Sequence, residues 1–298
     1  MKIRNKQLLG FIIGILGIVL FSSKAVLVKL LYKHDVPMIT ALFLRMIFSF
    51  PFYVFILISS SKKNTNSKIS TKNFIWILFF GFVGYYLASL FDFIGLTYIK
   101  ASLERVILFV YPTIVLLFNF LFLKEKISKQ QLVATLVTYI GIAIAFGAEV
   151  SVSGSNVVLG GFFVLLSAIT YASYLVGSGW LIPNIGVVRF TSHVMLVSCI
   201  CVFIHYAIIS ETSIFSYSSE VYILGFLIAI LATVIPSFLV SWSIKLISSS
   251  NFAILASLGP VSTIILAVIF LDEYLSMIQL LGTLVVIIGV LLISRNKK

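Results

Sequence analysis

Charged side chains are scarce in this sequence. Asp, Glu, Lys and Arg make up 10% of the 298 residues, whereas 61% of the residues are hydrophobic. A soluble chain of this length needs more charge than this to cover its surface, so the composition excludes a soluble globular protein and indicates one embedded in a lipid bilayer. The formal net charge of +12 does not indicate nucleic-acid binding, because the basic residues form short clusters at the ends of apolar runs and no basic face.

Motifs for catalysis, metal binding and nucleotide binding are also missing. The two cysteines, Cys199 and Cys201, lie in one apolar run, and helical residues two apart point about 200° from each other, which disfavours a disulfide or a shared metal ion. The sequence has no P-loop, no His-Glu-x-x-His motif, no Gly-x-Ser-x-Gly elbow and no break long enough for a soluble domain. We therefore predict no catalytic residue, no metal and no cofactor, and we disfavour an ATP-driven pump and an intramembrane enzyme.

Long apolar runs dominate what is present. A helix needs about 20 apolar residues to cross the hydrocarbon core, and ten runs meet this requirement. They cover residues 8–31, 38–59, 74–98, 101–123, 130–148, 158–181, 187–209, 221–244, 250–271 and 277–294. Fifteen of the 21 Lys and Arg residues fall on the side of the termini, which by the positive-inside rule is the cytoplasmic side. The prediction is an all-α protein with ten transmembrane helices, N-in/C-in, in the cytoplasmic (inner) membrane.

The two halves of the chain resemble each other. Residues 101–147 and 249–295, offset by 148 positions, share 13 identities in 47 positions without a gap, among them Pro112 with Pro260 and Glu125 with Glu273. Five helices per half is an odd number, so the second half must enter the membrane from the opposite side. The sequence therefore predicts two inverted five-helix repeats, 1–148 and 149–298, an arrangement typical of secondary transporters that work by alternating access.

The repeated segments resemble the EamA-type transporter family of the drug/metabolite transporter superfamily. The residues that carry the resemblance are TYIKAS at 97–102, YP at 111–112, FLKEK at 122–126, LISSS at 246–250, GP at 259–260 and LDE at 271–273. The resemblance implies a ten-helix secondary exporter or importer of small organic solutes. We predict a secondary-active exporter of small organic metabolites, such as amino acids, with a solute, protons and the lipid bilayer as partners. A monomer is expected, with a homodimer as the alternative. An importer or exchanger of an anionic metabolite, and a non-transporting membrane interaction protein, are the alternative functions.

Charges inside the spans are the first candidates for the site. An ionisable group there costs about 2.5–3.5 kcal/mol on insertion scales, so it usually faces a cavity or a partner. Counting 1.5 Å per residue places Lys24, Arg45 and Asp92 in the outer half of the membrane, near Glu104 and Arg105. At the 148-residue offset the second half lacks Asp92, Glu104 and Arg105. Asp92 is predicted to bind substrate or a proton, to orient helices through an ion pair with Lys24 or Arg45, or to lie at the outer mouth with easy access to water.

Aromatic residues are the second candidates. Tyr85 shares a stripe of helical spacing with Gly81, Ala88, Asp92 and Gly95, which predicts one wall of a polar cavity. In the second half, Tyr174 and Trp242 are candidates for an aromatic wall that would suit apolar, aromatic or cationic solutes. Single aromatic residues in membrane helices serve packing or the interfacial belt more often than they bind substrate.

Two symmetric pairs have structural interpretations. Pro112 and Pro260 lie within predicted spans, where proline opens the helix locally, so each is either a hinge at the cavity wall or a static kink. Glu125 and Glu273 stand between two helices and are predicted to cap the free amides of a helix N-terminus. Neither glutamate is expected to touch substrate.

Overall fold

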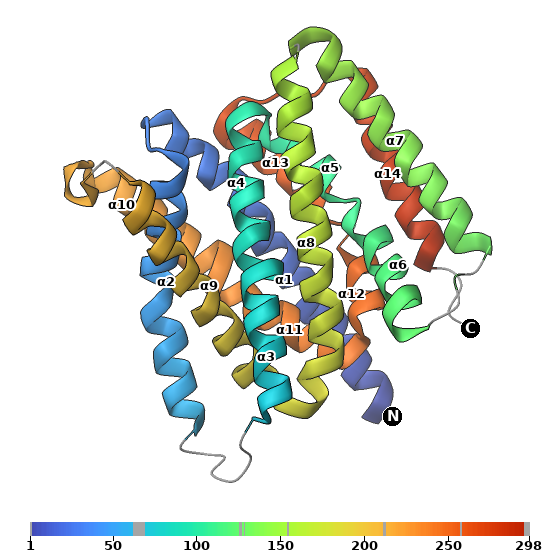
Figure 1. The fold of residues 1–298 in the computed structure, drawn as a ribbon. Coiled ribbons are helices and arrows are strands. Elements are labelled where there is room, and N and C mark those ends of the chain that lie inside the picture. The colour runs from blue at the N-terminus through green and yellow to red at the C-terminus, as the bar shows by residue number, and fades with distance from the viewer. Residues whose placement is uncertain are drawn as a thin grey trace.

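The computed structural model describes residues 2–61, 69–124, 127, 129–153, 155–210, 213–256 and 258–294, and the regular structure within these ranges is helical (Figure 1). The α-helices are α1 (Lys2–Lys33), α2 (Met38–Ser61), α3 (Thr71–Phe79), α4 (Ala88–Tyr98), α5 (Ala101–Leu108), α6 (Tyr111–Leu123), α7 (Lys129–Ser153), α8 (Ser155–Ile185), α9 (Val187–Ile209), α10 (Ser219–Ala229), α11 (Ile235–Ile247), α12 (Ser249–Leu255), α13 (Leu258–Leu271) and α14 (Met277–Ser294). The π-helical segments Phe80–Leu87 and Ile230–Val234 join α3 to α4 and α10 to α11, and Ile214–Ser216 forms a short 3₁₀ turn.

Eight helical stretches within the described ranges are long and apolar enough to cross a membrane. They are Lys6–Lys33, Met38–Ser60, Thr71–Tyr98, Ala101–Phe122, Asn156–Ile185, Val187–Ile209, Ser219–Ile247 and Ser249–Leu271. The predicted spans 130–148 and 277–294 correspond to α7 and α14, whose apolar parts, Thr135–Ala148 and Met277–Gly289, are shorter. The prediction of an all-helical, multi-pass membrane protein is confirmed, whereas the count of ten spans stays a prediction.

Four of these eight stretches change their helical geometry midway. In Thr71–Tyr98 and Ser219–Ile247 the change is a π-helical segment, a feature often found at functional sites. The stretches Ala101–Phe122 and Ser249–Leu271 are each interrupted between two α-helices. In both, the second helix begins next to a proline: Pro112 is the second residue of α6, and Pro260 is the third residue of α13. Proline is tolerated there because an amide in the first turn has no intrahelical acceptor. The hinge role of both prolines stays a prediction.

Pairs of helices distant in sequence form the bundle. The central helix α1 packs against α11 and α13, α4 packs against α8, and α2 packs against α9. Helix α7 lies along α14 at one edge of the bundle (Figure 1). Large apolar side chains such as Phe55, Ile204 and Ile208 are exposed on the outside, as expected for a surface that faces lipid and not water.

The α7–α14 contact depends on small residues. A Cβ atom added to Gly282 would lie 2.7 Å from the backbone nitrogen of Ala145 and 2.7 Å from the carbonyl oxygen of Gly141. We expect Gly282→Ala to lower the melting temperature of the purified protein, because this overpacking costs about 1–3 kcal/mol. Gly147→Ala in α7 is the control, since nothing lies within 4 Å of its added Cβ. Equal melting temperatures for the two variants would contradict this account of the contact.

Candidate functional site

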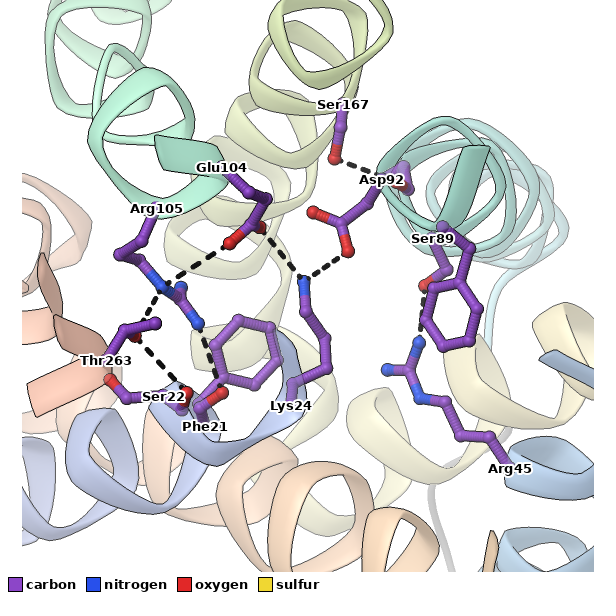
Figure 2. Close-up of polar contacts among 12 residues, drawn as sticks. Phe21, Ser22, Lys24, Arg45, Ser89, Asp92, Glu104, Arg105, Ser167 and Thr263 are labelled. Carbon is purple, nitrogen blue, oxygen red and sulfur yellow. Dashed lines mark hydrogen bonds and ion pairs between the residues drawn. The ribbon is translucent and has the colours of Figure 1, made fainter. Parts of the chain in front are cut away.

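Four buried charges meet between α1, α4 and α5. The Nζ atom of Lys24 lies 2.7 Å from Oδ2 of Asp92 and 3.7 Å from Oε1 of Glu104, and Nε of Arg105 lies 3.9 Å from Oε2 of Glu104 (Figure 2). The side chains of all four are at most 5% exposed. We call these four residues the charge network. Its two cations and two carboxylates cancel in formal charge.

The two carboxylates of the network depend mainly on the neighbouring cations. Although the Lys24–Asp92 contact is short, neither the Asp92 nor the Glu104 oxygens accept a well-directed hydrogen bond from any described residue. Arg105, by contrast, donates from Nε to Thr263 at 3.0 Å and from Nη2 to the carbonyl oxygen of Phe21 at 3.2 Å. A buried carboxylate without hydrogen bonds is costly, so Asp92 and Glu104 have unused capacity to bind a proton or another donor.

Arg45 lies apart from the charge network. Its Nε donates to Thr233 at 2.7 Å and its Nη1 to Ser89 at 2.9 Å, and its guanidinium lies over the rings of Tyr85 and Phe93 at 5.8 and 5.6 Å. The residue is 1% exposed. Across the described part of the chain, no carboxylate comes within 4 Å of it to form an ion pair. Arg45 is therefore a buried cation whose contacts are hydroxyls and rings.

A pocket separates Arg45 from the charge network. It is narrow, with room for little more than one water molecule, and its lining comprises Phe21, Lys24, Arg45, Gly84, Tyr85, Ala88, Ser89, Leu108, Ser167 and Tyr171. We call it the central pocket. The rings of Phe21 and Tyr171 stack at 6.0 Å between centroids, and both also line two smaller gaps beside this pocket. One wall of the central pocket is thus aromatic, while another presents cations.

The π-helical segment Phe80–Leu87 positions Tyr85 in this wall. Its ring packs edge-on against Tyr174 at 5.2 Å, and Tyr174 in turn bonds Ser241 through its hydroxyl at 3.3 Å. A Cβ on Gly84 would lie 2.6 Å from Cβ of Tyr174, so glycine lets this segment approach α8. The residues of the stripe predicted from the sequence do not all line one cavity. Tyr85 faces the central pocket, whereas Gly81, the first residue of the stripe, packs against Val197 of α9.

The two ends of the bundle differ. At the end where α11 meets α12, a large pocket of ≈ 1080 Å³ is lined by Asn119, Val176, Ser178, Gly179, Trp180, Ile182, Pro183, Ile244, Lys245, Ser248, Ser249 and Ser250. We call it the vestibule. At the opposite end, where α4 meets α5 (Figure 1), Lys29 donates to the carbonyl oxygen of Leu96 at 3.0 Å and Tyr32 to that of Phe93 at 2.8 Å. These contacts tie α1 to α4, and we call this end of the bundle the closed end.

Glu273 completes the closed end. Its carboxylate accepts from the backbone amides of Ala101 and Ser102, both at 3.0 Å, and from the Ser102 hydroxyl at 2.8 Å. Glu273 therefore caps the N-terminus of α5, which belongs to the other half of the sequence, and not that of the helix that follows it. The corresponding prediction for Glu125 falls on a residue outside the described ranges.

The sequence placed five charged residues in one layer of the membrane, and four of them form the charge network. It anticipated the ion pair between Asp92 and Lys24, whereas Arg45 bonds elsewhere on the central pocket. Trp242 is 39% exposed, lies beneath Lys245 at 5.0 Å and lines none of the described pockets. The contributions of Phe21 and Ser89 were missed, although each lies three residues before a buried charge and so on the same helical face.

Comparisons with known proteins point to one family of membrane transporters. The sequence model of the EamA-like transporter family matches this chain twice, at residues 8–147 and 158–295. The uncharacterized transporter YcbK of Bacillus subtilis (strain 168) is 31% identical over 278 residues, which cover 92% of this chain and 88% of that protein. The uncharacterized transporter sll1319 of Synechocystis sp. (strain ATCC 27184 / PCC 6803 / Kazusa) is 25% identical and covers 98% of this chain and 95% of its own length.

A solved structure shares the fold. A protein described only as "Crystal structure of protein" superposes with a TM-score of 0.71 over 96% of this chain and 98% of its own. The sequence identity is 15%, so this likeness concerns the backbone arrangement alone.

Proposed function

This chain belongs to the EamA-like transporter family, and we propose that it is a secondary-active exporter of small organic metabolites, such as amino acids, that works by alternating access in the cytoplasmic membrane. The observation that carries the proposal is the central pocket: a polar and aromatic cavity between buried charges, set between a closed end and a vestibule. Solute sites of secondary transporters lie near the middle of the bundle, between two repeats.

We propose further that the chain is built from two inverted five-helix repeats, 1–148 and 149–298, with ten spans in total. The pairing of helices supports this. In the proposed repeat α1 is equivalent to α8, α4 to α11 and α6 to α13. The contact of α1 with α11 then has its counterpart in the contact of α8 with α4, and the contact of α1 with α13 has its counterpart in that of α8 with α6. The α2–α9 and α7–α14 contacts each join equivalent helices. The two matches of the family model, one per half, point the same way.

The proposed N-in/C-in orientation assigns the vestibule to the cytoplasm. The structure then corresponds to an inward-open state, closed on the outside by Glu273 and by the contacts of Lys29 and Tyr32. An exporter loads its solute in this state. The breaks beside Pro112 and Pro260 are the proposed sites at which the helices bend when the open end changes.

Protons are the proposed coupling ion, and the charge network is their proposed site. Lys24 lies within 4 Å of both Asp92 and Glu104, so a proton on one carboxyl group leaves the other beside the ammonium, and a proton on Asp92 also leaves Glu104 beside Arg105. Lys24 also lines the central pocket, which places this exchange beside the solute. The protein is proposed to work as a monomer, because one chain contains the whole pocket.

An exchanger or importer of an anionic metabolite is the second candidate. It is favoured by Arg45, which faces the same pocket without an acidic partner among the residues that the structure describes. The direction of net flux would then follow the solute gradient and not the proton gradient.

Two measurements test the proposed function. Purified protein is first screened for thermal stabilisation by amino acids and related metabolites at two pH values, because a ligand that binds the folded state raises apparent stability. Each hit is then added to liposomes that contain the protein and a trapped pH indicator, under an imposed pH gradient. We expect at least one hit to dissipate the gradient in these liposomes and not in protein-free ones. If no compound stabilises the protein and none moves a proton, the proposal is wrong.

A further inference from the structure

We propose that Arg45 binds the carboxylate of the transported solute, and that the solute is a small monocarboxylate whose remaining body is apolar or aromatic. This inference rests on the proposed transport function and adds the substrate class and the residue that selects it. It depends on three features of the central pocket: an incompletely bonded guanidinium, one uncompensated charge and a wall of rings.

The guanidinium of Arg45 has unused donors. A guanidinium carries five N–H groups; Thr233 and Ser89 accept well-directed hydrogen bonds from two of them, and the Tyr85 hydroxyl lies within hydrogen-bonding reach. The other buried guanidinium provides a comparison within the same protein. Arg105 has Glu104 beside it as well as Thr263 and a backbone carbonyl. Arg45 has hydroxyls and rings but no carboxylate beside it among the described residues, which leaves a place for the anionic group of a solute.

Charge counting fixes the class of anion. The charge network cancels within itself, which leaves Arg45 as the single uncompensated charge on the central pocket among the described residues. A carboxylate supplies one negative charge and accepts two parallel N–H bonds from a guanidinium. A phosphate ester brings about 1.5–2 negative charges near neutral pH, which would leave excess charge in a buried site.

The walls of the pocket define the rest of the solute. Tyr85 lies beside Arg45 and Tyr171 stacks on Phe21, and these rings with Leu108 form most of the apolar lining. In this structure the free space of the central pocket has room for little more than one water molecule, so a solute enters only when the surrounding rings move apart. This favours a small solute, with a single ring or a short branched chain, whose carboxylate lies on Arg45 and whose apolar part lies against the rings.

Matched acid and amide probes test this inference without any mutation. The probes are 3-phenylpropionate and 3-phenylpropionamide, L-phenylalanine and L-phenylalaninamide, and isocaproate and isocaproamide. Each pair differs only in the carboxylate. We expect thermal shift and calorimetric titration of the wild-type protein to show binding of at least one acid with about tenfold to hundredfold higher affinity than its amide, the range for a charge-assisted hydrogen bond.

Variants then assign the preference to Arg45. Arg45→Gln is expected to bind the acid about tenfold to hundredfold more weakly and to bind acid and amide alike. Arg45→Lys keeps the charge but loses the planar pair of donors, so it should retain part of the preference. Lys72→Gln, which removes an exposed cation at the start of α3, is the control and should behave as wild type. If Arg45→Gln does not fold, the wild-type acid and amide titrations together with Arg45→Lys decide the question.

The outcomes separate this inference from the proposed function. Acid binding that survives unchanged in Arg45→Gln overturns the role of Arg45. Equal wild-type affinity for every acid and its amide overturns the carboxylate class, and so does transport of other solutes by a protein that binds none of these acids. In each of these cases transport by the wild-type protein would stand. Absence of transport for every solute tested would instead contradict the proposed function itself.

Discussion

Asp92→Asn is expected to abolish solute transport driven by a pH gradient while solute binding at the central pocket persists. The substitution keeps the size of the side chain but removes the carboxylate that lies 2.7 Å from Lys24. Glu104 is then the one remaining carboxylate within 4 Å of Lys24 among the described residues. A proton on Glu104 would leave a buried ammonium without a counter-ion, so the variant cannot exchange protons at acceptable energy. Flux in liposomes with and without a pH gradient measures the loss.

Stability measurements show whether the effect belongs to coupling or to folding. Breaking a buried ion pair on one side costs about 3–5 kcal/mol, whereas replacing both partners by apolar groups is often neutral. Asp92→Asn should therefore lower the melting temperature, and adding Lys24→Met should restore much of it without restoring pH-driven flux. Glu220→Gln removes an exposed carboxylate and serves as the control. Full pH-driven flux in Asp92→Asn would remove the charge network from the coupling mechanism.

Glu273→Gln is expected to shift the protein toward the state that is open at the α4–α5 end. The glutamine amide keeps one acceptor oxygen, whereas the carboxylate accepts three hydrogen bonds from Ala101 and Ser102. Charge-assisted bonds contribute about 1.5–3 kcal/mol each, and loss of the negative charge at the N-terminus of α5 removes a further favourable interaction with the helix dipole. Loss of one such bond changes the ratio of the two states by about tenfold to hundredfold.

Cysteine accessibility measures this shift. In a background carrying Cys199→Ser and Cys201→Ser, Ala101→Cys reports on the closed end, and Ser249→Cys, 148 residues later, reports on the vestibule. Glu273→Gln should speed the labelling of position 101 by a water-soluble maleimide and slow that of position 249. Asp272→Asn, at the adjacent exposed carboxylate, is the matched control and should change neither rate. Unchanged labelling at both positions in Glu273→Gln would show that this cap does not hold the end closed.

The sequence predicted the depth of each charged residue in the membrane, but not the side of its helix on which the residue lies. Counting residues placed Lys24, Arg45 and Asp92 at similar depth, and the structure then separates Arg45 from the other two. Direction depends on helical phase, and the π-helical segment Phe80–Leu87 changes the phase between Gly81 and Asp92. No propensity scale predicts such a segment from one sequence, because packing against neighbouring helices determines it.

The helix that Glu273 caps could not be predicted from the sequence either. Capping was predicted from its position before a helix, which is a local property of the sequence. The helix that it caps, α5, lies about 170 residues earlier in the chain, and only the packing of one half against the other brings them together. Trp242 illustrates the same limit: its residue type suits an aromatic wall, but its helical phase places it on the outside of the bundle.

The difference between the two buried guanidinium groups determines how a membrane voltage acts on the cycle. Without a bound proton the charge network sums to zero and contributes no electrical work, whereas Arg45 carries one charge. A voltage of 100 mV is worth about 2.3 kcal/mol for each elementary charge that crosses the whole membrane. With a carboxylate on Arg45 the loaded protein is neutral there, so the voltage acts on the return of the empty protein. A negative interior then draws the empty site inward, to the side on which an exporter loads.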